Sequence, residues 1–224
     1  MRAKSRYHFK IKAVIFDMDG VITNTMPDHY RAWVRILKDY AVHVSFLDIY
    51  SREGQRCIDS VQELCAAYGR VVTASKAAQI LKSKEEYFKK IVKLRFIPGA
   101  RRFLKSLYFA NFKLALVTGT SRDELHRILP EYIYKLFSVI VTGSDVKNGK
   151  PHPEPYLKAL KKLDIDPQEA IVIENAPFGI ESAQKAGLYS LALETSLPKS
   201  YLKKADAVFA SIKELQQKVK LTLN

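Results

Sequence analysis

Six short apolar runs separated by helical patterns are the feature of this sequence that most limits its possible folds. The runs are rich in β-branched residues and apolar at consecutive positions, which is typical of strands buried on both faces of a parallel sheet. They are KAVIFD near 12–17, FKLALVT at 112–118, SVIVTG at 138–143, AIVIEN at 170–175, LYSLAL at 188–193 and ADAVFA at 205–210. The helical patterns lie at roughly 98–110, 121–133, 153–163, 177–187 and 211–220. The alternation predicts an α/β fold with a doubly wound parallel sheet.

The alternation is interrupted once, between the first and the second run. Residues 26–95 contain several helical patterns and no strand-like run, and Pro98 and Gly99 mark where the alternation resumes. We therefore expect an α/β core made of residues 1–25 and 96–224, with residues 26–95 as an inserted helical cap. Ligands of such sheets bind at the carboxyl ends of the strands, so the residues that follow each run are the first candidates for a site.

Composition and charge exclude some classes of protein and leave others open. No apolar run approaches the roughly 18–20 residues of a membrane span, and the apolar stretch at 13–16 is far shorter than the core of a signal peptide. We therefore expect a cytoplasmic globular protein. The chain has 37 Lys and Arg against 23 Asp and Glu, a net charge of +14, which favours anionic partners without choosing among them. The basic opening MRAKSRYHFKIK is expected to form a solvated arm.

Two carboxylates follow the first run directly. Asp17 and Asp19 are two residues apart, so on an extended backbone both side chains point to the same side. Like charges so close together need a cation, and Mg²⁺ prefers a few carboxylates together with water and phosphate oxygens. The pair therefore favours a magnesium site over the plainer alternative, a turn-forming Asp followed by a helix cap.

Polar residues also follow the next three runs. The second run ends in Thr118-Gly119-Thr120, where hydroxyls and N–H groups at a helix start favour phosphate, although an ordinary helix cap explains them equally well. Lys150 lies in a proline-stiffened stretch after the third run, with a solvated surface position as the alternative. The fourth run ends in Glu174-Asn175, and an acid that leaves an apolar strand is costly unless a cation accompanies it. Together these residues can supply a nucleophile, a phosphate clamp and a metal site.

The same residues carry a resemblance that covers nearly the whole chain. The sequence resembles phosphatases and phosphotransferases of the haloacid dehalogenase superfamily, with a helical cap inserted after the first strand. The similar motifs are FDMDGV, VTGT, NGKPHPEPY and VIENAPFGIESAQKAG. One departure is that the last motif usually has two adjacent acids, whereas here Asn175 follows Glu174. We expect weaker Mg²⁺ binding than in the relatives, and an Asn175→Asp variant with an unchanged Mg²⁺ requirement would contradict this.

The resemblance implies a mechanism with a covalent intermediate. Asp17 attacks phosphorus and forms an aspartyl-phosphate, while Asp19 protonates the leaving oxygen and then activates the incoming one. Thr118 and Lys150 hold phosphate oxygens. Mg²⁺, the implied cofactor, offsets the repulsion between carboxylate and phosphate. Its implied ligands are Asp17, the backbone carbonyl of Asp19, Glu174 and Asn175.

A closer resemblance lies at the start of the inserted segment. FDMDGVITNTMPDHYRAW is similar to the opening of β-phosphoglucomutases, and SREG at 51–54 is similar to the cap loop that faces the active site in that branch. The resemblance implies a set of substrate-binding residues: Thr25, His29, Arg52, Gly119 and Thr120. The alternatives are a helix cap for Thr25 and a surface position for His29.

The cap lysine expected of a mutase has no single counterpart in the sequence. Before Tyr87 the nearest candidates are Lys82 and Lys84, within a basic stripe that extends to Arg95. Two glutamates interrupt the stripe and aromatic residues are not interleaved with it, so we interpret it as a solvated face rather than a nucleic-acid site.

These observations lead to an expected function with two alternatives. The leading expectation is an Mg²⁺-dependent phosphatase of small phosphate monoesters, sugar phosphates in particular. A phosphosugar mutase of the β-phosphoglucomutase type is the enzymatic alternative, and a basic binding protein on a disabled enzyme fold is the remote one. We expect a small phosphorylated metabolite as the partner, no nucleic-acid or membrane partner, and a monomer.

Overall fold

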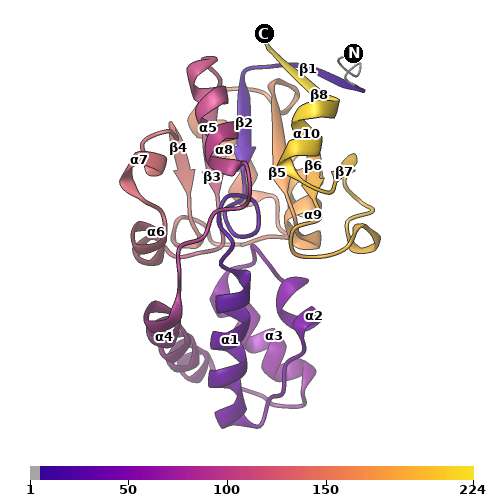
Figure 1. Ribbon diagram of the computed structural model, residues 1–224. Coiled ribbons are helices and arrows are strands. Elements are labelled where there is room, and N and C mark those ends of the chain that lie inside the picture. Colours follow the sequence, from indigo (N-terminus) through magenta and orange to yellow (C-terminus); the bar gives the residue numbers. More distant parts are fainter. Residues whose placement is uncertain (1–5) are drawn as a thin grey trace.

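The structure, a computed structural model, describes residues 6–224. Its main sheet has six parallel strands in the order β4-β3-β2-β5-β6-β7 (Figure 1). The strands are β2 (Ala13–Phe16), β3 (Lys113–Val117), β4 (Val139–Val141), β5 (Ala170–Glu174), β6 (Tyr189–Leu193) and β7 (Ala207–Phe209). Each of the six apolar runs contains one of these strands, so the predicted parallel sheet is confirmed.

The strand order places a change of winding direction at the centre of the sheet. From β2 the chain adds β3 and β4 on one side and then crosses to add β5, β6 and β7 on the other. Phe16, the last residue of β2, is in register with Leu116 of β3 and Ile173 of β5. The carboxyl ends of these three strands therefore meet at one edge, where the crevice of a doubly wound sheet forms.

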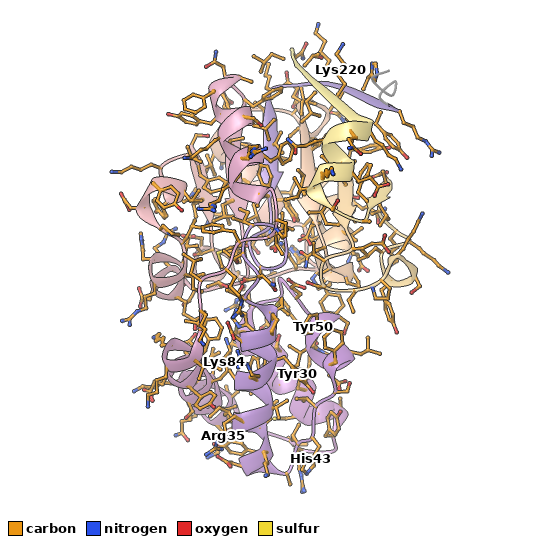
Figure 2. The ribbon with its side chains drawn as sticks, viewed as in Figure 1. Tyr30, Arg35, His43, Tyr50, Lys84 and Lys220 are labelled. Atoms are coloured by element: carbon orange, nitrogen blue, oxygen red, sulfur yellow. The ribbon has the colours of Figure 1, made fainter. Side chains whose placement is uncertain are left out.

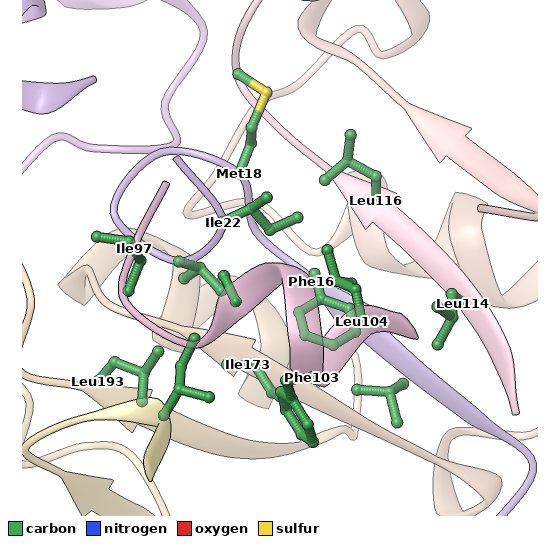
Figure 3. Close-up of a cluster of buried hydrophobic side chains, with 14 of the residues drawn as sticks. Phe16, Met18, Ile22, Ile97, Phe103, Leu104, Leu114, Leu116, Ile173 and Leu193 are labelled. Carbon is green, nitrogen blue, oxygen red and sulfur yellow. The ribbon is translucent and has the colours of Figure 1, made fainter. Parts of the chain in front are cut away.

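Helices cover both faces of the sheet. Val14 and Phe16 pack into one apolar layer, part of which Figure 3 shows around Phe16, Phe103 and Leu104. Ala13 and Ile15 face the opposite layer. The first layer is formed by α5 (Ala100–Phe109), α6 (Arg122–Ile128), α7 (Glu131–Tyr134) and α10 (Ile212–Lys218), and the second by α8 (Glu154–Leu163) and α9 (Pro177–Lys185). Because both faces of β2 are covered, all four of its residues are buried.

The helical pattern at 121–133 forms two helices instead of the single one predicted. Helix α6 ends at Ile128, and α7 begins only after Pro130. A proline disfavours helical backbone at the residue before it and has no N–H to donate. Leu129 is accordingly extended, with φ −96° and ψ 115°. Pro130 therefore divides the predicted helix.

Four α-helices lie between β2 and α5. They are α1 (Met26–Leu37), α2 (Phe46–Tyr50), α3 (Cys57–Ala67) and α4 (Ala74–Ile91). In Figure 1 these helices lie beyond the carboxyl ends of the strands, which point toward them. They share an apolar core of their own that includes Trp33, Leu37, Val61 and Leu64. The insertion thus presents one side to the strand ends.

Short 3₁₀ segments complete the connections. They are η1 (Lys38–Tyr40), η2 (Gly143–Asp145), η3 (Pro167–Glu169) and η4 (Lys199–Tyr201). None of the helices found across residues 6–224 has the length and apolar character that crossing a membrane requires.

A second, two-stranded sheet joins the two ends of the described chain. Strand β1 (Tyr7–Ile11) pairs in parallel with β8 (Val219–Leu223). The ring of Tyr7 contacts Phe209 edge-on, with 5.8 Å between centroids, and Phe9 contacts Tyr189 at 4.9 Å. The expectation of a solvated arm is therefore wrong for residues 7–11, because alternate aromatic side chains anchor the segment to the main sheet. Residues 1–5 of the expected arm, and of the expected core domain 1–25, lie outside the described residues.

Candidate active site

Asp17 lies directly after β2, at the edge where the three strand ends meet. Its Oδ1 accepts a hydrogen bond of 2.7 Å from Lys150 Nζ, whereas its Oδ2 is buried without a hydrogen-bond partner. Burial raises the pKa of Asp17 well above its ordinary value, and the Lys150 ammonium opposes that shift. The carboxylate is thus fixed through one oxygen and open at the other.

Lys150 is the buried cation of the site. Its Nζ donates to Asp17 Oδ1 and Glu174 Oε1, each at 2.7 Å, and to the Val117 carbonyl at 3.1 Å. Burial lowers the pKa of Lys150, but the two carboxylates raise it by more, and the pKa lies well above the ordinary value. Only 1% of the residue is exposed, which excludes the alternative of a solvated surface lysine.

Glu174 ends β5 and is held by four hydrogen bonds. Its Oε1 accepts from Lys150 and from the Tyr156 hydroxyl at 3.0 Å, and its Oε2 accepts from the backbone N–H groups of Asn175 at 2.8 Å and Ala176 at 3.1 Å. The last two donors stand at the start of α9, where N–H groups have no partners within the helix. The carboxylate is therefore rigid, and it orients Lys150 toward Asp17.

Two buried oxygens at this edge accept no hydrogen bond and are free to bind a metal ion. Asn175 donates from Nδ2 to Ser196 Oγ at 2.8 Å, but its Oδ1 has no partner, and neither has Asp17 Oδ2. Orphaned carboxylate and amide oxygens are suitable ligands for Mg²⁺. Within residues 6–224, no three Asp, Glu, His or Cys side chains already form a cation cage, since Lys150 stands between Asp17 and Glu174. The residues present fit a cation held by a few protein oxygens together with water or phosphate.

Asp19 is surrounded by polar groups from the start of α1 and from the turn after β3. Its Oδ1 accepts a short hydrogen bond from the Thr25 hydroxyl, and its Oδ2 accepts one of 3.1 Å from Thr120 Oγ1. His29 Nε2 lies 3.6 Å from Oδ1. Burial raises the pKa of Asp19, but His29, Thr25 and Thr120 lower it by more, so the net shift is downward. Asp19 is thereby held as an ionised carboxylate.

Thr25 lies against the Asp19 carboxylate and does not face the cavity, where a substrate-binding residue is expected. It is completely buried, and its hydroxyl is used by Asp19 and by Thr23 at 3.2 Å. Without this donor, Asp19 would be a buried charge with one hydrogen bond fewer, which is costly. Thr25 therefore contacts the carboxylate and not the space open to a substrate.

The residues that follow β3 also lie at the edge where the strand ends meet. Thr118 is 4% exposed, and its hydroxyl accepts a hydrogen bond of 3.1 Å from the Thr120 N–H. This bond leaves the hydroxyl hydrogen of Thr118 free to donate. The backbone then turns through Gly119 and Ser121 into α6. Thr118 is thus placed to donate to an anion at the strand ends.

His29 connects this edge to a lysine of the inserted helices. Its Nδ1 lies 3.1 Å from Lys84 Nζ, and its ring stacks on Phe88 with 4.0 Å between centroids. Lys84, labelled on α4 in Figure 2, is completely buried and its ammonium also lies over the ring of Trp33. The interpretation of the basic stripe as a solvated face is therefore wrong for Lys84, whereas Lys82 is exposed as that interpretation expects. Helical packing of α4 against α1 turns one lysine inward.

The loop between α2 and α3 docks on the strand ends through close backbone contacts. A Cβ placed on Gly119 would lie 2.4 Å from the Gln55 carbonyl oxygen and 2.6 Å from that of Gly54. A Cβ on Gly149 would lie 2.5 Å from Arg56 Cγ, and one on Gly54 would lie 2.8 Å from Lys150 Cδ. Glycine on both sides of the contact allows this approach. The inserted helices are thus closed onto the core.

A cavity of about 50 Å³ remains between the two parts. The predicted site residues that line it are Asp19, His29, Arg52, Gly119 and Thr120. Its other walls include the apolar side chains of Met26, Trp33 and Leu64. Pockets for small ligands have volumes of roughly 300–1,000 Å³. The closed arrangement therefore has no room for a sugar phosphate, and a substrate of that size enters only when the loop moves away.

Arg52 lies on the wall of this cavity without contacting the residues at the strand ends. Its Nη1 donates to the Asp48 carbonyl at 3.0 Å, and its Nε lies 3.4 Å from Glu63 Oε2. Both partners belong to the inserted helices. The structure thus brings Asp17, Asp19, Thr118, Lys150, Glu174 and Asn175 together at one edge, with His29 beside Asp19 and Arg52 on the cap wall of the cavity.

Three residues of the site were missed or left undecided at the level of sequence. Tyr156 belongs to the NGKPHPEPY motif and Glu53 to the SREG motif, yet nothing in either pattern distinguishes them from neighbours. Lys84 is one of two adjacent candidates, and only burial selects it. A weak signal exists for Tyr156, because an aromatic residue two positions after Glu154 falls on the apolar face of α8.

Comparison with known proteins gives a consistent set of relatives. A family model described as haloacid dehalogenase-like hydrolase matches residues 14–193. A phosphorylated carbohydrates phosphatase of Thermotoga maritima is 32% identical over 185 residues, which is 80% of this chain and 82% of that protein. A β-phosphoglucomutase of Bacillus subtilis is 30% identical over 203 residues, 84% of this chain and 85% of that protein.

Solved structures agree with these relatives. The crystal structure of a β-phosphoglucomutase from Clostridium difficile superposes with a TM-score of 0.80 at 26% identity. The match covers 93% of this chain and 96% of that one. The likeness extends over the sheet and the inserted helices together, because a match restricted to either part would cover much less of the chain.

Proposed function

The chain belongs to the haloacid dehalogenase-like hydrolase family, and from this premise we propose that it is an Mg²⁺-dependent phosphatase of small phosphate monoesters, with sugar phosphates as the expected substrates. As a member with phosphatases and mutases among its relatives, it is an enzyme of phosphoryl transfer. The excess of 14 positive charges favours an anionic substrate.

The observation that carries the proposal is the Asp17 carboxylate with one oxygen bound by Lys150 and the other without a partner. A carboxylate held in this way is a positioned nucleophile. Asp17 attacks phosphorus, the phosphorus–oxygen bond to the alcohol breaks, and an aspartyl-phosphate forms. Water then attacks the same phosphorus, and phosphate leaves with regeneration of the carboxylate. Lys150 and Thr118 bind oxygens of the transferred group.

Asp19 serves as the acid and base of both steps. In the first step it gives a proton to the leaving alcohol oxygen, and in the second it takes a proton from the attacking water. The contacts with Thr25 and Thr120 fix its orientation. In the closed structure its pKa is lowered, which suits the base. A bound phosphate anion beside it raises the pKa again, since a like charge disfavours ionisation, and this suits the acid.

Asp17, the backbone carbonyl of Asp19, Glu174 and Asn175 would hold the Mg²⁺ ion. A bound divalent cation offsets the repulsion between the carboxylates and the phosphate dianion. We further propose that residues 26–95 act as a cap on a core of residues 1–25 and 96–224. The small cavity and the close docking of the α2–α3 loop support a cap that opens for substrate and then excludes water.

A specific observation also favours the second candidate, a phosphosugar mutase. Lys84, His29 and Asp19 form a buried chain of contacts that links the cap to the acid and base of the core. Such a link makes the protonation of Asp19 depend on cap closure around a sugar. A mutase requires this, because water must not reach the aspartyl-phosphate before the second sugar hydroxyl does.

The test is ³¹P NMR of the purified protein with Mg²⁺ and a panel of phosphate monoesters that includes β-glucose 1-phosphate with a trace of the bisphosphate. Release of inorganic phosphate supports the phosphatase, and glucose 6-phosphate as the main product supports the mutase. Acid quench of a single turnover with ³²P-labelled substrate is expected to trap label on the wild-type protein and none on Asp17→Asn. Equal turnover by Asp17→Asn contradicts the mechanism.

A further inference from the structure

Glu53 is a buried carboxylate that the mechanism above does not use. It lies in the loop between α2 and α3, is 4% exposed, and neither of its oxygens has a hydrogen-bond partner. An ionised carboxylate removed from water in this way is unfavourable unless a cation or several donors accompany it. A cation or further donors are therefore expected beside Glu53.

The Glu53 carboxylate stands next to Asn175 at the strand ends. A Cβ placed on Gly20 would lie 2.8 Å from Glu53 Oε1, 2.1 Å from Asn175 Nδ2 and 2.6 Å from Ser196 Oγ, so these three polar atoms converge on one point. Gly20 has φ +83° and no side chain, which leaves the space that they fill. The cap loop thus inserts an acid into the core site.

The charges around this point do not balance. Burial is the largest cause that raises the pKa of Glu53, the charges of Asp17, Asp19 and Glu174 raise it further, and the nearby Asn175 side-chain amide lowers it without offsetting them. Lys150 is the buried ammonium at this edge, and its hydrogen bonds go to Asp17, Glu174 and the Val117 carbonyl. Four buried carboxylates therefore share one lysine and the more distant His29.

We propose that Glu53 is a cation ligand supplied by the cap, which completes the Mg²⁺ site of the proposed active site. The inference rests on the proposed function for the identity of the cation. Among the described residues of this site, the oxygens that lack partners are Asp17 Oδ2, Asn175 Oδ1 and both oxygens of Glu53. They belong to residues around one site, and their chemistry matches the oxygen preference of Mg²⁺. Asn175 is a neutral amide, so Glu53 adds the charge that this position does not provide.

A ligand on the α2–α3 loop binds the cation only while the loop is docked, so cation binding and cap closure stabilise each other by the same free energy. Docking without the cation places Glu53 among like charges. Removal of the cation therefore favours the open arrangement.

The test measures cation binding directly. Isothermal titration calorimetry with Mg²⁺, and EPR of Mn²⁺, are applied to the wild type and to Glu53→Gln, which keeps the size of the side chain and removes its charge. The affinity of Glu53→Gln is expected to fall by roughly tenfold or more. The double variant Glu53→Gln/Asn175→Asp restores a carboxylate beside the same point and is expected to recover most of the affinity.

A matched control is Glu124→Gln. Glu124 is 1% exposed and also has two oxygens without partners, but it lies on α6 and is not among the charges that shift the pKa of Asp17 or Glu53. Its loss is expected to leave the cation affinity unchanged. Thermal melting in EDTA supplies a second readout: Glu53→Gln is expected to melt at or above the wild-type temperature, because a buried unpaired charge has been removed.

Two results separate this inference from the proposed function. If Glu53→Gln binds Mg²⁺ as tightly as the wild type, or melts well below it in EDTA, Glu53 is not a cation ligand, even when the wild type hydrolyses phosphate monoesters. If the wild type binds no Mg²⁺ and releases no phosphate from any substrate, the proposed function fails and the inference fails with it.

Discussion

Replacement of Lys150 by methionine tests how much the buried ammonium stabilises the two carboxylates at the strand ends. Methionine keeps the apolar stem of the side chain and removes the ammonium, which donates to Asp17 and Glu174 at 2.7 Å each and to the Val117 carbonyl at 3.1 Å. The two carboxylates are 2% and 0% exposed, so water does not take the place of the lost donor. The substitution therefore leaves buried negative charge without compensation.

The free energy of unfolding is expected to fall by about 3–5 kcal/mol, which is the cost of breaking a buried ion pair. An unfolding entropy of about 2.1 cal/mol/K per residue corresponds to about 0.47 kcal/mol/K for the 224 residues. The Tm is then expected to fall by about 6–11 °C at pH 7.5. The deficit shrinks as the pH decreases toward 5, because the pKa of Asp17, already raised by burial, rises further without the ammonium, and its protonation removes the unpaired charge.

Differential scanning calorimetry in EDTA measures this loss without interference from bound cations. Lys204→Met is the matched control, since Lys204 forms a 2.9 Å ion pair with Glu181 at the surface, where the lysine side chain is 66% exposed. The control is expected to change the Tm by less than about 2 °C. A Lys150→Met protein whose Tm lies within 2 °C of the wild type, or whose deficit grows as the pH falls, would refute the reasoning.

Three further predictions concern other parts of the site and its surroundings. Thr118→Ala is expected to lower kcat/KM by about a hundredfold in a phosphate-release assay, as for the loss of one donor to a transition-state anion, and to lower the Tm by about 2–6 °C, because the buried Thr120 N–H also loses its acceptor; a fall in kcat/KM smaller than threefold contradicts its role. Gly119→Ala places a Cβ 2.4 Å from a backbone oxygen of the docked loop, so small-angle X-ray scattering is expected to report a larger radius of gyration, and an identical scattering curve would count against the closed docking. Burial raises the pKa of Asp145, but Arg122 and Thr142 bring it down to about 2, below its ordinary value of 3.8. The stabilisation from Asp145 is therefore present above pH 4 and lost as the pH falls toward 2, and Asp145→Asn is expected to show a flatter Tm in that window, which a pH series of melts tests.

The sheet could be predicted from the sequence because its strands are central and parallel. Such strands are apolar on both faces, so a run such as that ending at Phe16 is visible without a partner. The same property indicates which residues to consider, those after each run, and in the structure Asp17 and Glu174 each lie 2.7 Å from Lys150 Nζ. These patterns do not predict the order of the strands in the sheet. The site could be predicted without that order, because parallel strands bring their carboxyl ends to one edge in any order.

The contributions of the cap could not be predicted in the same way. Lys84 and Lys82 stand two positions apart in one helix, and which of them faces inward depends on how α4 packs against α1. Glu53 follows an arginine in a polar loop, where a solvated acid is the ordinary case. The pairing of β1 with β8 joins segments more than 200 residues apart, and neither segment has an apolar run long enough to reveal it.

The pairing of β1 with β8 also determines how the protein resists force. The strands are parallel, and Tyr7 lies opposite Val219 while Ile11 lies opposite Leu223. Tension applied between Tyr7 and Leu223 pulls the two strands along their length in opposite directions, so their hydrogen bonds are loaded together in shear and do not open one after another. The remainder of the chain bears no load until this pair has ruptured. In an optical trap, the first event is therefore expected to be one abrupt rupture at the terminal pair, after which the sheet and the helices between the strands extend.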